Sequence, residues 1–259
     1  MKGLTIRSVT QAVGGVLYCN GKRLSDGADD ERQISAVTID SRTVTENSLF
    51  IAIKGERNDG HDFIKECLDK GAAAVISEKI IPDENRPVIV VDSTLKALRD
   101  LASFYRSQLN VKVVGITGSV GKTSTKETIA SVLATRYRVL KTKGNYNNEI
   151  GVPLTVFRIT EDDEVAVLEM GISDFGEMER LTAIAKPDIC VITNIGQCHL
   201  ENLGTRDGIL KAKTEIFKGM SDNGVAVLNG DDDKLCTVNE VHGRKPIFFG
   251  IDNTEGIHA

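Results

Sequence analysis

Apolar residues fall into short runs along the chain, and these runs alternate with segments whose apolar positions have helical spacing. In the first part of the chain the short runs lie at 36–42, 48–55, 73–77 and 87–92, and an amphipathic segment lies at 61–72. Short apolar runs bounded by turn residues are typical of strands, and strands that alternate with helices indicate an α/β unit. The sequence therefore predicts a small α/β domain over residues 1–92.

A second amphipathic segment begins at Ser93. Apolar residues at positions 95, 98, 101, 104 and 105 fall on one face of a helix, and the Ser93 side chain can cap its first turn. We place the domain junction here, because the first set of strands ends and a longer alternation begins. The second domain is therefore expected to cover residues 93–259.

The second part of the chain repeats the alternation over a longer span. Strands are predicted at 111–116, 137–142, 165–170, 189–195, 225–229 and 247–249, and helices at 122–136, about 176–185 and about 205–220. This order is typical of an α/β fold with a doubly wound, mostly parallel sheet. Such sheets bind their ligands at the carboxyl ends of the strands.

The composition limits the partners of the protein. Hydrophobic residues make up 41% and charged residues 27% of 259 residues, with a formal net charge of −5. A nucleic-acid surface normally shows a basic excess, so no nucleic-acid partner is expected. No segment approaches the roughly 18 apolar residues of a membrane span, and the N-terminus lacks the apolar core of a signal peptide. We therefore expect no membrane insertion.

The five cysteines are scattered and form no C-x-x-C pair. An odd, dispersed set fits free thiols in a reducing compartment, so a cytoplasmic location is expected. We further expect a monomer.

A glycine-rich turn joins the strand at 111–116 to the helix at 122–136. It places Gly118 and Gly121 directly before Lys122 and Thr123. Backbone N–H groups at a helix N-terminus can hold a phosphate, a lysine can reach the terminal phosphates, and a hydroxyl can bind Mg²⁺. A plain glycine turn would explain the glycines but not the Gly-Lys-Thr run after an apolar strand. We therefore predict a nucleotide site.

The spacing of this turn departs from the common phosphate-loop pattern. In G-x-x-x-x-G-K-[ST] the first glycine lies five positions before the second, and that position here is Ile116. Gly115 is one residue out of register. The pattern alone therefore indicates a variant loop rather than the common one.

Glu169 ends the apolar strand at 165–170. A buried carboxylate without a partner is costly, and at a strand end beside a phosphate loop a metal ion would compensate it. At a solvated sheet rim the same side chain would need no partner. The neighbouring loop favours the metal interpretation.

His199 follows the strand at 189–195. A single histidine is more often a structural residue than a ligand, and nothing in the spacing selects between these roles. Asn194 and Glu201 make the surrounding turn polar enough to form the wall of a site.

Lys213 lies on the apolar face of the helix predicted at 205–220. The apolar arc consists of Ile209, Leu210, Ile216, Phe217 and Met220. Either the lysine stem packs there while its ammonium reaches water, or the amine is desolvated, which lowers its pKa and makes it available for chemistry. Helix geometry leaves both interpretations open.

The segment LNGDDD at 228–233 follows a predicted strand. Three consecutive acids usually form a solvated turn. Asn229 and Asp232 can equally hydrogen-bond a base or a ribose at the edge of the sheet.

Six segments, in this order along the chain, resemble the Mur ligases of bacterial cell-wall synthesis. They are TGSVGKTSTKE, KGNYNNEIGVPLT, LEMGISDFGEMERL, VITNIGQCHLENLG, AKTEIF and LNGDDD. The resemblance runs from about residue 36 to residue 250. The phosphate loop of that family is T-G-[ST]-x-G-K-[TS], so its first glycine corresponds to Gly118 and not to Gly115.

The segments KGNYNNEIGVP and MGISDFGEM resemble the family member that adds D-alanyl-D-alanine to UDP-N-acetylmuramoyl-tripeptide. The segment IDSRTVTENSLFIAIKGERNDGHDFI is similar to the UDP-binding domain of the same enzymes. The implied function is an ATP-dependent amide ligase that works through an acyl phosphate. Two alternatives remain: the family member that adds the third amino acid, and a non-catalytic module that binds UDP-sugars or nucleotides.

The resemblance also implies roles for individual residues. The ATP phosphates would be held by Thr117, Gly118, Ser119, Val120, Gly121, Lys122, Thr123 and Ser124, and the adenosine would lie near Asn229 and Asp232. One Mg²⁺ would bind Thr123 and Glu169, and a second would bind His199 and a carbamylated Lys213. Catalytic roles would fall to Lys122, Lys213 and His199.

The remaining implied contacts concern the substrate. Asn145 would lie near the γ-phosphate or the tripeptide, and the tripeptide side would include Asn147, Asn148 and Ser173. The UDP portion would face Ser41, Glu56, Arg57 and Asn58. Mur ligases have a further C-terminal domain beyond the position of Ala259, so the chain alone is expected to bind the UDP-substrate and ATP with little or no ligase turnover.

Overall fold

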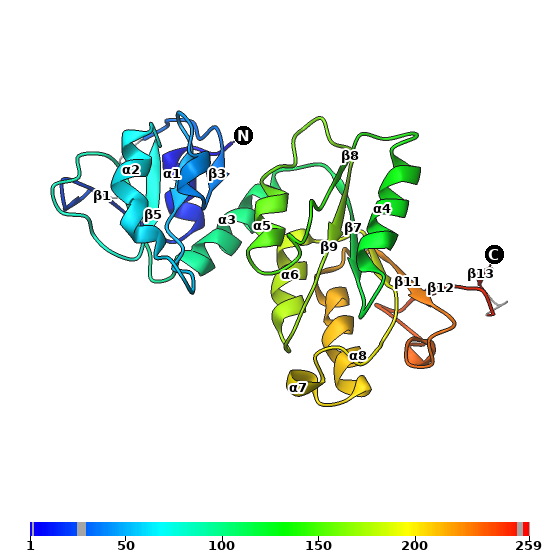
Figure 1. The fold of residues 1–259 in the computed structure, drawn as a ribbon. Helices are drawn as coiled ribbons and strands as arrows, with labels where there is room; N and C mark the ends of the chain where they lie inside the picture. Colours follow the sequence, from blue (N-terminus) through cyan, green and yellow to red (C-terminus); the bar gives the residue numbers. More distant parts are fainter. Residues whose placement is uncertain (2, 25–29, 253–255, 259) are drawn as a thin grey trace. The chain divides into compact units, whose positions relative to one another are not determined.

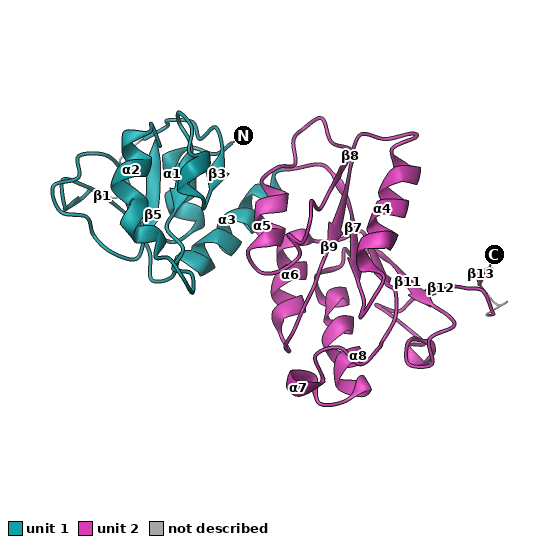
Figure 2. Cartoon of the chain, viewed as in Figure 1, with its two compact units in different colours: residues 1–108 teal, residues 109–259 magenta. Residues whose placement is uncertain are grey.

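A computed structural model describes the chain except residues 2, 25–29, 253–255 and 259. The chain divides into two compact units, residues 1–108 and 109–259 (Figure 2). This boundary differs from the predicted junction at residue 93. Helix α3 (Thr94–Ser107) belongs to the first unit, because its buried face packs against α1 and β5 of that unit.

The first unit is an α/β domain. Its helices are α1 (Ile6–Ala12), α2 (Ile64–Asp69) and α3, with 3-10 turns η1 (Ser41–Thr43) and η2 (Gly60–Phe63), and its strands are β1 (Val16–Cys19), β2 (Lys22–Arg23), β3 (Val37–Thr38), β4 (Leu49–Ile51), β5 (Ala74–Ser77) and β6 (Val88–Val90). The sheet order is β2-β1-β6-β5-β4-β3. Strands β3 to β6 run parallel to one another, whereas β1 is antiparallel to both β2 and β6.

The strand predicted at 36–42 is shorter in the structure. Strand β3 ends at Thr38, because the Asp40 N–H donates to the Thr38 hydroxyl (3.0 Å) and the Asp40 carboxylate accepts from the Arg42 N–H (3.0 Å). These local bonds cap the turn η1 and compete with strand pairing. The predicted Ser41 contact therefore lies on a 3-10 turn.

The second unit has a seven-stranded sheet in which every pair is parallel. Its strands are β7 (Lys112–Thr117), β8 (Val139–Lys141), β9 (Val165–Glu169), β10 (Ile189–Ile192), β11 (Val225–Asn229), β12 (Ile247–Gly250) and β13 (Ile257–His258), in the order β13-β12-β11-β10-β7-β9-β8. Its helices are α4 (Lys122–Leu133), α5 (Gly151–Val156), α6 (Glu177–Ala185), α7 (Leu200–Leu203) and α8 (Arg206–Thr214), with 3-10 turns η3 (Glu215–Gly219) and η4 (Leu235–Thr237). The mostly parallel α/β fold predicted from the sequence is confirmed.

Helices cover both faces of this sheet (Figure 1). On one face, Val114 and Ile116 of β7 pack with Ala130 of α4 in a buried cluster. Gly115 points to the opposite face, where a Cβ atom would lie 3.3 Å from the sulfur of Met170 and 3.5 Å from Ile216. Gly115 is therefore a packing residue of the strand and takes no part in the phosphate loop.

The helix predicted at 205–220 changes form at Glu215, where α8 gives way to η3. The chain here runs close to α6, because the Thr182 hydroxyl donates to the Ile216 carbonyl (2.8 Å) and Gly219 lies against the Thr182 backbone. In the described part of the chain, none of the helices has the length and apolar content that crossing a membrane would require.

Candidate functional site

The glycine-rich turn follows β7 and opens α4, as predicted. Gly121 has a positive φ of 81° and forms the N-cap of α4 without a side-chain cap, so the first N–H groups of the helix have no capping side chain. Such a helix terminus is suited to anions. Gly118 also has a positive φ, and a Cβ atom at this position would overlap the hydroxyl of Thr193. Both glycines are therefore required by geometry.

The residues after β10 hold this loop in place. Asn194 accepts from the N–H of Val120 and donates to its carbonyl, both at 3.0 Å. The Thr193 hydroxyl donates to the same carbonyl at 2.6 Å, and the N–H of Gly196 donates to the Ser119 hydroxyl at 2.8 Å. The turn around Asn194, predicted only to be a polar wall, is thus a direct support of the phosphate loop.

Lys122 lies across the loop that it follows. Its ammonium donates to the carbonyl of Gly118 at 2.8 Å and to that of Ser119 at 3.4 Å. The Thr117 hydroxyl at the end of β7 is buried and has no hydrogen-bond partner among the described residues. Ser124 lies exposed in the first turn of α4. The predicted loop residues therefore form one compact cradle at the carboxyl edge of the sheet.

Glu169 is brought to this cradle by strand register. It ends β9, pairs with Ile116 of β7 and is only 2% exposed. Its Oε2 accepts from the Thr123 hydroxyl at 3.0 Å, and its Oε1 accepts from the Asn147 amide at 2.8 Å. The predicted proximity of Thr123 and Glu169 is therefore present in the structure.

Lys126 is a part of the site that the sequence did not reveal. It lies on α4, its side chain is 1% exposed, and its Nζ is 3.6 Å from Oε2 of Glu169. A second carboxylate, that of Glu127, lies 3.3 Å from the same ammonium. The only sequence signal was a lysine one turn after Lys122, which is also typical of a solvated helix face.

Lys213 is buried on α8, with a side chain that is 2% exposed. Burial lowers its pKa from 10.5 to about 8, the nearby Cys198 opposes this shift, and the ammonium of Lys122 lowers the pKa further. The structure thus supports the desolvated interpretation of this lysine. Within the described residues, no hydrogen bond or ion pair is recorded for its amine.

His199 lies exposed at the N-cap of α7 with a positive φ of 58°. In the described part of the chain its ring has no recorded hydrogen bond or ion pair. That His199 and Lys213 bind one Mg²⁺ stays a prediction.

Asn229 and Asp232 serve the backbone around the site. Asp232 accepts from the N–H of Ile195 (2.7 Å), and its other oxygen accepts from Lys234 (2.9 Å) and Leu235 (3.0 Å). The Asn229 amide donates to the Thr193 carbonyl at 3.0 Å. Both residues therefore support the segment that holds the phosphate loop.

The other predicted substrate residues of this unit also have local bonds. Asn148 accepts from the N–H groups of Ile150 (3.2 Å) and Gly151 (2.9 Å) at the start of α5. The Ser173 N–H donates to Glu177 at 2.7 Å. Asn145 is exposed.

The predicted UDP contacts lie in the first unit. Ser41 begins η1, and its carbonyl accepts from the Lys70 ammonium at 3.0 Å. Glu56, Arg57 and Asn58 form an exposed turn that is closed by a bond from the Gly55 N–H to the Asn58 carbonyl at 2.9 Å.

The donor set at the loop fits a hard cation in part. The Thr123 hydroxyl and the Glu169 carboxylate are oxygen ligands of the kind that Mg²⁺ takes, with water and phosphate oxygens completing the shell. Among the residues that the structure describes, no three His, Cys, Asp or Glu side chains come together as a cation site. The protein can therefore supply few ligands by itself, as is usual for a metal that binds with a nucleotide.

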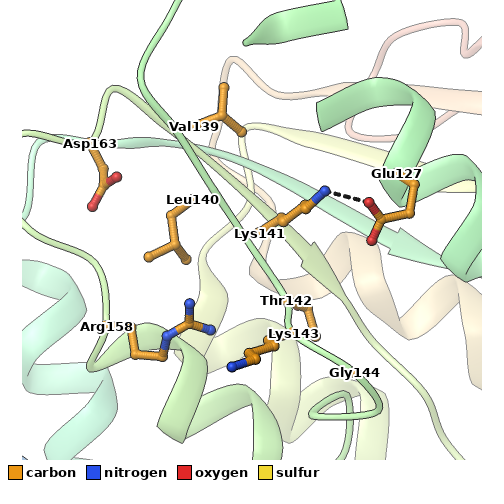
Figure 3. Close-up of a pocket in the computed structure, with 9 residues that line it drawn as sticks. All are labelled: Glu127, Val139, Leu140, Lys141, Thr142, Lys143, Gly144, Arg158 and Asp163. Atoms are coloured by element: carbon orange, nitrogen blue, oxygen red, sulfur yellow. Dashed lines mark hydrogen bonds and ion pairs between the residues drawn. The ribbon is translucent and has the colours of Figure 1, made fainter. Parts of the chain in front are cut away.

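A separate cavity of about 370 Å³ opens beside strand β8 (Figure 3). Lys141 of β8 forms an ion pair there with Glu127 of α4. Lys143 and Arg158 also line this cavity. Two of its lining residues adjoin the cradle: Glu127 follows the buried Lys126 in sequence, and the Thr142 hydroxyl accepts from the Glu169 N–H at 2.9 Å.

Comparison with protein families gives two matches. Residues 116–259 match the model of the Mur ligase middle domain, and residues 33–106 match that of the Mur ligase family, catalytic domain. The chain is 45% identical over 233 residues to the UDP-N-acetylmuramoyl-tripeptide--D-alanyl-D-alanine ligase of Bacillus subtilis, which covers 89% of this chain and 50% of that protein. The enzyme of the same name from Escherichia coli is 36% identical over 248 residues, with coverages of 96% and 52%. The chain spans about half the length of these curated relatives.

Solved structures agree with these matches. MurF from Acinetobacter baumannii has a TM-score of 0.84 at 34% identity and covers 95% of this chain and 53% of its own. MurF ligase from Thermotoga maritima, solved in complex with ADP, has a TM-score of 0.78 at 40% identity and coverages of 84% and 51%.

Proposed function

The chain belongs to the Mur ligase family, and from this premise we propose that it carries the UDP-substrate and ATP-binding parts of a ligase that joins D-alanyl-D-alanine to UDP-N-acetylmuramoyl-tripeptide. The names of the similar proteins from Bacillus subtilis and Escherichia coli support this substrate pair. The ADP complex of the Thermotoga maritima relative supports ATP as the nucleotide.

One observation carries the proposal: Thr123 and Glu169 meet at 3.0 Å directly beside the glycine-rich loop and Lys122. A phosphate cradle and a pair of oxygen ligands at one sheet edge are the parts that phosphoryl transfer requires. In the proposed mechanism the tripeptide carboxylate attacks the γ-phosphate of ATP, which gives an acyl phosphate and releases ADP. Thr123 and Glu169 would hold Mg²⁺, which would neutralise charge on the phosphates. The amine of D-alanyl-D-alanine then displaces phosphate to form the amide.

The residues of the chain would orient these reactants. The loop N–H groups would bind phosphate oxygens, and the Lys122 ammonium would exchange its two loop carbonyls for a phosphate. Thr123 and Glu169 would hold Mg²⁺, and Asn147 would keep the carboxylate of Glu169 in place. Such positioning supplies most of the rate enhancement in this class of reaction.

We propose a second, substrate-side Mg²⁺ on His199 and a carbamylated Lys213. The support is the burial of the Lys213 amine without a recorded acidic partner in the described part of the chain, because carbon dioxide reacts with a neutral amine. His199 is exposed at the N-cap of α7, the short helix directly before α8, which carries Lys213. Mass spectrometry under bicarbonate tests the modification: a Lys213→Ala variant should lose a 44 Da adduct that the wild-type chain carries.

The contacts proposed for the substrates follow the same scheme. The UDP portion is assigned to Ser41 and the exposed turn 56–58 of the first unit, and the adenosine to the neighbourhood of Asn229 and Asp232. The tripeptide is assigned to the loop that contains Asn145 and Asn148 and to Ser173. We further propose that the chain acts as a monomer.

Calorimetry of ADP binding in the presence of Mg²⁺ tests the proposal. The variant Lys122→Ala should lose at least about tenfold in affinity, because a charge-assisted phosphate contact is removed. Lys65→Ala is the matched control, since it removes the same charge from an exposed helix position in the first unit. Equal binding by Lys122→Ala and the wild-type chain would contradict the assignment of the loop.

The amine substrate needs a separate assay. ADP formation is measured with UDP-N-acetylmuramoyl-tripeptide and D-alanyl-D-alanine, and with the UDP-linked dipeptide and a diamino acid as the alternative pair. In a protein as long as the relatives that contains this chain, the first pair should give ADP. The 259-residue chain alone should show little turnover. Activity with the second pair alone would instead assign the chain to the ligase that adds the third amino acid.

A further inference from the structure

Lys126 is a buried charge that the proposed chemistry does not use. Its side chain is 1% exposed, and its Nζ lies between two carboxylates, 3.6 Å from Oε2 of Glu169 and 3.3 Å from Oε1 of Glu127. Burying an ammonium is costly unless it is paired, and few lysines are buried to this extent. The position of this lysine therefore calls for a function beyond surface solvation.

The carboxylate of Glu169 is fixed from three directions. Asn147 donates to Oε1 at 2.8 Å, whereas Thr123 donates to Oε2 at 3.0 Å. Lys126 approaches Oε2 as well and is the one cation paired with Glu169 in the described part of the chain. Because Asn147 is on a loop and the other two residues are on α4, the plane of the carboxylate is defined by independent elements.

A second, more exposed ion pair lies on the far side of the Lys126 ammonium. Glu127 is bound by Lys141, which extends from strand β8 across the cavity beside that strand (Figure 3). Lys141 and Glu127 are both about half exposed, with side chains 42% and 47% accessible. The charged side chains thus form a row, from the solvated pair of Lys141 and Glu127 to the buried pair of Lys126 and Glu169 at the phosphate loop.

We propose that Lys126 is a positioning residue for the cation site: it holds Oε2 of Glu169 toward the Thr123 hydroxyl, so that the two oxygen ligands are set before a metal–nucleotide complex arrives. The proposal rests on the proposed function, because it assigns the metal to Thr123 and Glu169. Groups that orient a metal ligand from behind commonly change metal affinity when they are removed. Lys126 does not itself contact the nucleotide or the reacting atoms in this assignment.

The test is the Mg²⁺ dependence of ADP binding by the 259-residue chain. In Lys126→Met the Mg²⁺ concentration for half-maximal ADP binding should rise about tenfold or more, whereas ADP affinity in EDTA should not change. Lys126→Arg keeps the charge but not the single nitrogen position, so its shift should be smaller than that of the methionine variant. If Lys126 were purely structural, both variants would change thermal stability. The Mg²⁺ dependence of ADP binding and the ADP affinity in EDTA would then change together or not at all.

Lys141→Met is the matched control. It removes the solvated outer pair but leaves Lys126 on Glu169, so its Mg²⁺ dependence should equal that of the wild-type chain. A shift in Lys141→Met as large as that in Lys126→Met would overturn the proposal, because a general loss of charge would then explain both results.

Folding has to be controlled, since removal of one partner from a buried pair is destabilising. Circular dichroism melting is therefore recorded for every variant, and Lys126→Gln replaces Lys126→Met where the latter does not fold. If neither of these variants folds, the Mg²⁺ dependence of Lys126→Arg is the test. The proposal is overturned if the folded variant that is measured binds ADP with the same Mg²⁺ dependence as the wild-type chain. Failure of the proposed function is a different result: Lys122→Ala would then bind ADP as the wild-type chain does.

Discussion

Replacement of Lys213 by methionine should stabilise the second unit at neutral pH. The methionine has a similar length and no charge, and the site is 2% exposed, so the apolar side chain avoids the desolvation cost of the ammonium. Burial lowers the pKa of Lys213 from 10.5 to about 8. The difference corresponds to roughly 3 kcal/mol of unfolding free energy as an upper bound.

The sign follows from proton binding. Between pH 8 and pH 10.5 the unfolded chain keeps the Lys213 proton while the folded chain has lost it, so wild-type stability rises with pH in this window. Below pH 8 both states are protonated and the folded state bears the full cost. The stability gained in Lys213→Met should therefore be largest below pH 8 and should disappear above pH 10.5.

The assay is thermal unfolding from pH 6 to pH 10.5 in buffers free of carbon dioxide. A gain of roughly 3 kcal/mol corresponds to about 6–12 °C in Tm for a unit of this size. Lys211→Met is the matched control, because Lys211 is exposed on the same helix and should change Tm little. A lower Tm for Lys213→Met at pH 7, or a gain that is independent of pH, would refute the assignment of a desolvated amine.

Three further outcomes are expected. Gly118→Ala should destabilise the chain by about 2 kcal/mol or more and weaken ADP binding, because the new methyl group would overlap the Thr193 hydroxyl; melting and calorimetry measure the two effects. Asp232→Asn should cost about 1–3 kcal/mol, since an amide cannot accept all three of the backbone bonds that the carboxylate accepts; urea unfolding measures it. Arg42→Ala should raise the pKa of Asp40 from about 2 toward 3.8, because the side-chain hydrogen bonds from Arg42, the largest cause of the low pKa, are removed while the bond from the backbone N–H of residue 42 remains; carboxyl NMR titration measures it.

Each of these outcomes has a control. Gly121→Ala introduces only the strain of a positive φ, because nothing lies within 4 Å of its Cβ position, and its cost should be near 1 kcal/mol. Equal losses in the two glycine variants would show that overlap with Thr193 is not the cause. Stability of Asp232→Asn equal to wild type would mean that its bonds are replaceable. An unchanged Asp40 titration in Arg42→Ala would place the cause of the low pKa elsewhere.

The parts of the site that follow from strand order were predictable. The sequence places Thr123 at the start of a helix and Glu169 at the end of a strand, and parallel pairing of β7 with β9 brings the two together. The burial of Lys213 was predictable as one of two alternatives, because helical spacing places it on the apolar arc. Desolvation, which decides between the alternatives, depends on what packs against that arc.

The supports of the site were not predictable. Helix α4 has few apolar residues, so nothing in its pattern marks Lys126 as buried; its buried ammonium pairs with Glu169 of strand β9, which is distant in sequence. The hydrogen bonds of Asn229 and Asp232 to backbone groups were also not foreseen, and their place near adenosine stays a proposal. Side-chain types at strand ends indicate a polar site, but they do not distinguish a residue that binds a ligand from one that shapes the loop.

The end of the first set of strands gives a similar lesson. A serine cap and an amphipathic pattern correctly predicted helix α3, but they could not show which unit the helix packs against. Likewise, the local bonds of Asp40 end β3 earlier than its apolar run suggested. Short polar side chains at Thr38 and Asp40 therefore account for the early end of this strand.

Two adjacent residues after strand β10 connect the phosphate loop to the turn that follows strand β11. Asn194 grips the phosphate loop, and the next residue, Ile195, is tied to Asp232 after strand β11. The backbone at residues 194 and 195 therefore fixes the distance between the turn after β7 and the turn after β11. Adding a single amino acid between positions 194 and 195 would leave each anchor chemically intact while removing the fixed spacing between them, so the two turns would then move independently.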